Sequence, residues 1–303
     1  MKKLINIGIV CIILGLIFTF QDSIVHFYNV VLVKFHKQEK LIKNEYYRDY
    51  DFMFVKNTSH FLPSSKKDLY NIYYTVINSG ANSFSFYCDV KYKNCIKDVE
   101  ELANNRALLS DINNLVHPFN SFKNIKTEYN NYGKITINVD HTYSEEQISL
   151  INDKIKEIKQ KLLVNDNLSD VEKIRIYHDY IIDNNIYDSN RSDRNIINYD
   201  SDTAYGAFFQ GFAICGGYTD AMALFLEDIG IKNYKISSNT HVWNAVLLNG
   251  NWLHLDLTWD DPVASDGNNY IDHNFFLIDT VKLQQLEKTQ HSFNEKIYKE
   301  LVG

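Results

Sequence analysis

The chain has 303 residues, of which 45% are hydrophobic and 23% are charged, a composition typical of globular proteins and not of disordered ones. It contains 12 Gly and 3 Pro, which excludes collagen-like and proline-rich architectures. The net charge is −7 and no long basic run is present, so the sequence indicates no nucleic-acid partner. A chain of this length is expected to form about two domains.

The amino-terminal segment is first basic and then apolar. Lys2 and Lys3 precede an apolar run from Leu4 to Phe20, which as a helix would be about 25 Å long, near the lower limit for crossing a bilayer. No small-residue cleavage site follows, so residues 1–21 are expected to be an uncleaved signal anchor of a single-pass cell-membrane protein. A cleaved signal peptide of a secreted protein and a buried soluble helix are the alternatives. The body of the protein, after a stalk over residues 22–45, would lie outside the cytoplasm.

The four cysteines are compatible with export. Cys11 lies within the apolar run. Cys88 and Cys95 are seven positions apart and would close a small disulfide loop in an oxidising compartment, although two reduced, half-buried thiols are the alternative. Cys215 is then left single, which is the arrangement that identifies a candidate reactive thiol.

Residues 46–165 are expected to form a smaller α+β domain, whose role the sequence does not reveal. The elements expected there are a helix or strand over 69–77, a strand over 84–92, a helix over 98–116, a strand over 134–140 and a helix from Ser144 to about Leu163. The strand over 134–140 rests on strict alternation of apolar and polar residues. The last helix rests on a serine cap followed by two glutamates.

Residues 166–303 are expected to form the second α+β domain. It begins with a helix capped by Ser169 or Asp170. Another helix is expected from Cys215 to Ile229, because apolar residues recur at helical spacing and Gly230 closes the segment. Strands are expected over 234–237, 241–248, 252–258 and 274–278.

Cys215 stands at the first position of its expected helix. The amino terminus of a helix stabilises an anion and so favours the thiolate, the reactive form of cysteine. Gly216 and Gly217 carry no side chains and would leave the sulfur approachable. Taken alone, a buried and inert cysteine would be the ordinary interpretation.

The sequence also predicts partners for this thiol. Asn249-Gly250 between apolar runs is typical of a two-residue hairpin turn, and in that register Leu248 pairs with Asn251. His241 and Asp256 then become diagonal neighbours on one face of the hairpin, within reach of a hydrogen bond. A slip by one residue would place them on opposite faces.

These residues match a nucleophile, a base and an orienting acid. Asp256 would hold the imidazole of His241, His241 would take the thiol proton, and Cys215 would attack a carbonyl carbon. His254 shares the face of Asp256 and is a candidate supporting residue, although a packed strand residue is the ordinary interpretation. His178 is interpreted as structural.

No metal or cofactor is expected. The sequence lacks HExxH, paired CxxC, GxGxxG and GxxxxGK[ST] motifs. A mixed site of Cys215, His241 and His254 is a minor alternative. The acidic loop over 256–266 lacks EF-hand spacing and is interpreted as a solvated turn.

A set of ordered motifs resembles the transglutaminase-like core of bacterial proteins. The matching segments are Gly211-x-x-x-Cys215-x-Gly217-Tyr218-x-x-Ala221, His241-x-Trp243-Asn244 and Gly250-x-Trp252-x-x-x-Asp256-x-Thr258-Trp259-x-Asp261-Pro262. The segment that precedes that core in the family is similar to Glu172-Lys173, His178-Asp179-Tyr180 and Tyr187-Asp188. The resemblance implies a papain-like fold, in which a helix bearing the cysteine packs on an antiparallel sheet bearing the histidine and aspartate. Its triad falls on Cys215, His241 and Asp256.

The resemblance further implies a cysteine-dependent acyltransferase or peptidase that acts on amide bonds of proteins or peptides through a thioester. The oxyanion donor would be the Gln210 side chain or the Cys215 backbone N–H, with Trp243 and His254 as further supporting residues. At the outer face of the membrane, the substrates would be cell-surface proteins or cell-wall peptides. A catalytically silent binding or scaffold module with the same fold is the alternative, and an unrelated cytoplasmic or structural protein is a further one.

Overall fold

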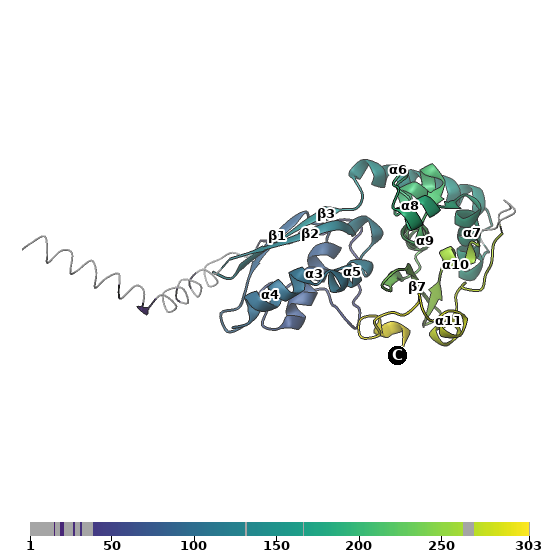
Figure 1. The fold of residues 1–303 in the computed structure, drawn as a ribbon. Coiled ribbons are helices and arrows are strands. Elements are labelled where there is room, and N and C mark those ends of the chain that lie inside the picture. The colour runs from purple at the N-terminus through teal and green to yellow at the C-terminus, as the bar shows by residue number, and fades with distance from the viewer. Residues whose placement is uncertain are drawn as a thin grey trace, which may run out of the picture.

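The structure is a computed structural model that describes residues 39–130, 132–165, 167–262 and 270–302, together with positions 15, 19, 20, 27 and 31. Most of the expected signal anchor, and most of the stalk, lie outside these residues. Within the described part of the chain, no helix has both the length and the apolar character needed to cross a membrane. Figure 1 shows a first unit built on one sheet and a second unit that contains the long helix α9.

A three-stranded antiparallel sheet organises the first unit. Its strands lie in the order β1-β3-β2 and are β1 (Ser83–Tyr87), β2 (Phe122–Tyr129) and β3 (Lys134–His141). Three helices pack against one face of this sheet, as Figure 1 shows: α3 (Lys66–Asn78), α4 (Cys95–Asn104) and α5 (Arg106–Asn114). The strand expected over 134–140 is confirmed, because Ile135, Ile137 and Val139 alternate into the core beneath the helices.

Three other expectations for the first unit are resolved. The ambiguous segment 69–77 belongs to helix α3. The helix expected over 98–116 is two helices, because Asn105 interrupts it and its side chain caps α5 by accepting from the N–H of Leu108. The strand expected over 84–92 ends at Tyr87, immediately before Cys88.

The two units are linked by helices with well-formed caps. Ser144 caps α6 (Glu145–Leu162) and Ser169 caps α7 (Asp170–Asp183), each in a reciprocal capping box. Both helices were expected, and the residue that caps the second one is Ser169, not Asp170. In Figure 1, α6 leads from the sheet of the first unit towards the helices of the second.

The centre of the second unit is a helix packed on an antiparallel sheet. The sheet has the order β6-β7-β8, and the elements are α9 (Cys215–Asp228), β6 (Asn233–Ser237), β7 (Val242–Leu248) and β8 (Asn251–Leu255). Smaller elements surround it: β4 (Ile186–Tyr187), α8 (Ser189–Arg194), the π-helical turn η2 (Gly206–Gln210), β5 (Phe212–Ala213), α10 (Leu257–Asp260), α11 (Thr280–Leu286) and the 3-10 turn η3 (Lys299–Leu301). The described chain is therefore of mixed α+β class.

The hairpin between β7 and β8 has the expected register. Leu248 pairs with Asn251, and the turn residues Asn249 and Gly250 have φ angles of 50° and 81°. Positive φ at both positions is the requirement of a type I′ turn, which asparagine and glycine meet at low cost.

Two expected strands are shorter than predicted. The strand expected over 252–258 ends at Leu255, because the side chain of Asp256 accepts from the N–H groups of Thr258 and Trp259 and starts α10. The strand expected over 274–278 is reduced to a single bridge between Ile278 and His254.

The two units share their hydrophobic cores. One buried cluster joins Tyr74 and Ile112 of the first unit to Tyr234 and Trp243 of the second. A buried cation also crosses between them, since the guanidinium of Arg48 lies 2.6 Å from Glu227. The division between residues 165 and 166 stays a prediction. The shared apolar cluster holds the sheet of the second unit against α5.

Candidate active site

Cys215 is the first residue of α9 and is half-buried. It opens into a cavity of 570 Å³. The residues that line this cavity are Tyr187, Arg191, Ser192, Ile214, Cys215, Thr240, His241, Thr258, Trp259 and Gln290. The thiol is thus accessible from a cleft that also contains the expected base.

Gly216 and Gly217 have a packing role that the sequence did not reveal. A Cβ atom at Gly216 would lie 2.7 Å from the carbonyl oxygen of Asp202, and one at Gly217 would lie 2.4 Å from that of Ser201. Only glycine therefore lets the backbone of this loop rest directly on the first turn of α9. The same loop accepts a hydrogen bond from the N–H of Ile214 at 2.8 Å, which fixes the entry to the helix.

The structure brings His241 and Asp256 together. His241 immediately precedes β7 and Asp256 immediately follows β8, so the hairpin register places them side by side. Nε2 of His241 lies 2.5 Å from Oδ2 of Asp256, and both side chains are buried. Cys215 lines the same cavity as His241 and contributes to the raised pKa of its imidazole, so the three residues of the expected triad lie in one site.

The electrostatics of the site favour a charged imidazole. Burial disfavours the imidazolium, but the Asp256 carboxylate and the neighbouring Cys215 outweigh it and raise the pKa of His241 to about 10. Burial likewise opposes the charge of Asp256, yet His241 and His291 hold the pKa of this carboxyl well below its usual range. Both shifts favour an imidazolium paired with a carboxylate.

Trp243 contacts both His241 and His254, and neither Trp243 nor His254 lines the cavity of Cys215. The indole of Trp243 stacks on His241 with 5.6 Å between ring centroids, and its N–H donates to Nδ1 of His254 at 3.0 Å. Burial, assisted by the nearby His291, lowers the pKa of His254 to about 3, so this ring is neutral and accepts the bond. Its Nε2 lies 3.0 Å from the hydroxyl of Thr280, which fixes the ring at its other edge.

The two candidate oxyanion donors differ in position. Gln210 does not line the cavity: its Oε1 accepts from the N–H of Asp200 at 2.7 Å. The backbone N–H of Cys215 lies at the start of α9, where donors have no partner within the helix. Gln290 lines the cavity and is a further amide donor, which the sequence did not indicate.

His291 is a site residue that the sequence analysis missed. Its Nε2 lies 2.8 Å from Oδ2 of Asp256, and its Nδ1 lies 3.0 Å from Glu287. The ring is buried and stacks on Phe275 at a centroid distance of 5.3 Å. It lies 35 positions after Asp256 and belongs to no motif, so only the tertiary structure reveals it.

Among the described residues, two groups place histidine and aspartate ligand atoms close together: His241 with Asp256 and His291, and His178 with Asp179 and His273. In the first group, Asp256 contacts one nitrogen of each imidazole, and Glu287 contacts the other nitrogen of His291, so His291 faces two carboxylates.

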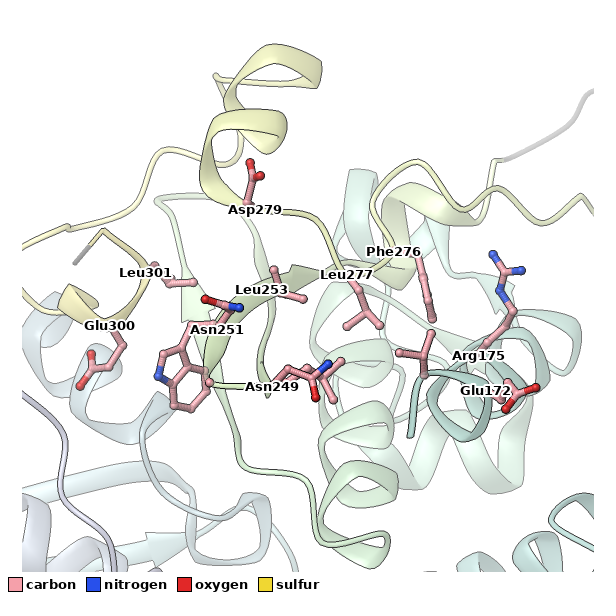
Figure 2. Close-up of a pocket in the computed structure, with 14 residues that line it drawn as sticks. Glu172, Arg175, Asn249, Asn251, Leu253, Phe276, Leu277, Asp279, Glu300 and Leu301 are labelled. Carbon is pink, nitrogen blue, oxygen red and sulfur yellow. The ribbon is translucent and has the colours of Figure 1, made fainter. Parts of the chain in front are cut away.

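A second cavity, of 890 Å³, lies at the turn of the β7–β8 hairpin (Figure 2). Figure 2 shows Asn249, Asn251 and Leu253 of the hairpin between Leu301 on one side and Arg175 of α7 on the other. His241 and Asp256 flank the opposite end of the hairpin, so this cavity is separate from the thiol.

No family model matches the chain, and no curated protein matches it. Among solved structures, it is similar to a transglutaminase, at a TM-score of 0.34 and 12% identity over 60% of this chain and 63% of that one. It is also similar to a "putative cysteine protease" from Cytophaga hutchinsonii, at a TM-score of 0.28 and 11% identity over 49% of this chain and 65% of that one. The chain thus spans slightly less than two thirds of each of these proteins.

Proposed function

We propose that this chain is a cysteine-dependent enzyme that acts on amide bonds of proteins or peptides, through a Cys215–His241–Asp256 triad and a thioester intermediate. The contact of 2.5 Å between Asp256 and His241, which lines the same cavity as Cys215, carries the proposal. A buried imidazole that contacts a carboxylate and lies in the same cleft as a thiol is an arrangement that can activate a cysteine nucleophile.

Each residue has a defined part in the reaction. The Cys215 thiolate attacks the carbonyl carbon, and the negative charge on the carbonyl oxygen is stabilised by the Cys215 N–H and the Gln290 amide. The His241 imidazolium then gives its proton to the leaving amine, and the thioester forms as the C–N bond breaks. An amine or a water molecule attacks the thioester, neutral His241 takes its proton, and the thiolate leaves.

The arrangement of elements supports a papain-like or transglutaminase-like catalytic unit over residues 166–303. The cysteine begins a helix that packs on an antiparallel sheet, and the histidine and aspartate flank two adjacent strands of that sheet. The chemistry needs no cofactor, because the imidazolium and backbone donors supply the proton and the charge stabilisation.

We further propose that residues 1–21 anchor the enzyme in the cell membrane with its body outside the cytoplasm. The disulfide between Cys88 and Cys95 supports an oxidising compartment. Its substrates there would be cell-surface proteins or cell-wall peptides. Digestion of intact cells with an added protease would remove residues 46–303 if this orientation is correct and would leave them intact if the body lies in the cytoplasm.

The rate of alkylation of Cys215 against pH tests the catalytic proposal directly. The measurement uses the full chain with Cys11→Ser, so that the disulfide remains and Cys215 is the thiol that reacts. We expect fast alkylation at and below neutral pH, lost in His241→Ala. If both proteins instead titrate like an ordinary thiol of pKa about 8.5, the triad is not assembled and a silent binding module is the better description.

A further inference from the structure

A second cluster of imidazole and carboxylate groups lies outside the triad. His178 and Asp179 are neighbours on α7, and His273 lies between α10 and α11. Oδ1 of Asp179 lies 2.8 Å from Nδ1 of His178 and 2.8 Å from Nε2 of His273. The three potential ligand atoms all lie within 4.8 Å of one another.

His178 faces more acceptors than a neutral ring can satisfy. Its Nε2 lies 3.2 Å from Oδ2 of the buried Asp260, while its Nδ1 faces Asp179. A neutral imidazole has one N–H, so if Nε2 donates to Asp260, the lone pair of Nδ1 points at a carboxylate oxygen. Such a contact needs a second proton or a cation between the two atoms. The ring of His178 is fully buried, so solvent water cannot separate Nδ1 from the carboxylate oxygen.

The surroundings favour a cation. We propose that His178, Asp179 and His273 bind a divalent transition-metal ion. A metal-bound histidine characteristically donates its other N–H to a carboxylate, and Asp260 has that position on His178. The side chains of Asp179 and His273 are 35% and 31% exposed, so water can complete the coordination sphere from the solvent side.

The donor set indicates which ions fit. Two imidazole nitrogens and one carboxylate oxygen suit Zn²⁺ and its neighbours Fe²⁺, Co²⁺ and Ni²⁺ rather than Mg²⁺ or Ca²⁺. With metal–ligand distances of about 2.1 Å, ligand atoms 2.8 Å apart subtend an angle of about 85° at the ion. For these two ligand pairs the angle fits adjacent positions of an octahedron, and water can fill positions that the protein leaves open.

The ion would act as a structural link between α7 and the turn that bears Asp256. Asp260, the partner of His178, accepts from the N–H of Phe275 at 2.9 Å. The carbonyl of Phe275 in turn accepts from the N–H of Asp256 at 3.1 Å. The site therefore stabilises the loop behind the triad and takes no part in the acyl chemistry.

The test uses the full chain, freed of metal by a chelator and then titrated with Zn²⁺ alone. Cys215→Ser is the parent protein, because it removes the thiol as a competing ligand. We expect one Zn²⁺ per chain and a melting temperature that rises with Zn²⁺ concentration. Co²⁺ should bind competitively and give the weak visible absorption of a six-coordinate ion.

Variants of this parent locate the ion. His273→Ala and Asp179→Asn change half-exposed residues and should each weaken Zn²⁺ binding by roughly tenfold or more. His60→Ala, at an exposed histidine of the first unit, should bind as the parent does. The proposal is overturned if Zn²⁺ does not bind stoichiometrically, because His178 or Asp260 then carries a second proton. It is also overturned if binding survives His273→Ala and is lost in His291→Ala, which would assign the ion to the triad.

Discussion

His291 contacts the same oxygen of Asp256 that contacts His241. The Nε2 atoms of His241 and His291 lie 2.5 Å and 2.8 Å from Oδ2, while Oδ1 accepts from the backbone at the start of α10. Every side of the buried carboxylate therefore has a donor, and its orientation is fixed. In the triad that we propose, Asp256 orients His241, and His291 would then act as a positioning residue.

Two substitutions of His291 should distinguish the effect of its hydrogen bond to Asp256 from the effect of the packing of its ring. His291→Ala leaves the Asp256 charge with one donor fewer, which should lower the free energy of unfolding by about 1.5–3 kcal/mol. His291→Gln retains an N–H donor and should recover part of both the stability and the alkylation rate of Cys215. Urea unfolding and alkylation at neutral pH measure the two effects. Equal losses in both variants would mean that the ring matters for packing alone.

Asp256 has two roles that two substitutions distinguish. Asp256→Asn keeps an oxygen able to cap α10 but loses the charge that stabilises the imidazolium, whereas Asp256→Ala loses both. Both should abolish fast alkylation of Cys215. The alanine variant should also be less stable than the asparagine variant by about 1 kcal/mol, measured by urea unfolding. Alkylation of Asp256→Asn at the parent rate would exclude the carboxylate from activating the thiol.

The raised pKa of His241 predicts a pH-dependent stability. Its pKa rises from 6.5 to about 10 on folding, so the folded state binds the proton more tightly. The resulting stabilisation is complete below pH 6.5 and is lost as the pH rises through about 10. The difference in unfolding free energy between the parent and His241→Gln should shrink over this window.

A control for this experiment is Cys215→Ser. The neighbouring cysteine is one of the causes of the raised pKa of His241, so its removal should move the loss of stability to lower pH. A difference between parent and His241→Gln that does not change with pH would show that His241 is not charged in the folded protein.

The parts of the site that the sequence predicted depend on short-range rules. The turn at Asn249-Gly250 sets the register of its own two strands, and this register brings His241 to Asp256. The helix starts at Ser144 and Ser169 were likewise predictable, because a cap and its partner lie within four residues.

The remaining features depend on contacts between distant segments. His291 and Gln290 reach the site through the path of the chain after α11, which no local pattern specifies. Gly216 and Gly217 matter because the backbone of residues 201–202 rests on them, and the printed sequence gives no indication of this contact. Gln210, a predicted oxyanion donor, does not line the cavity of Cys215, because the turn at η2 directs its amide to Asp200.

Removing the disulfide should weaken the first unit and leave the thiol site intact. Cys88 and Cys95 connect the end of β1 to the start of α4 and close a loop with a sequence separation of seven. Loop-closure entropy for such a loop corresponds to about 2–3 kcal/mol, so Cys88→Ser with Cys95→Ser should lower the free energy of unfolding by about that amount. Alkylation of Cys215 in native buffer should not change, because the first unit reaches the sheet of the second unit through α5 and Tyr74 and not through this loop.

A reductant should destabilise the parent to the level of the double variant and have no further effect on the variant itself. Equal stability of parent and variant without reductant would show that the bond contributes nothing, and it would also remove this support for an oxidising compartment.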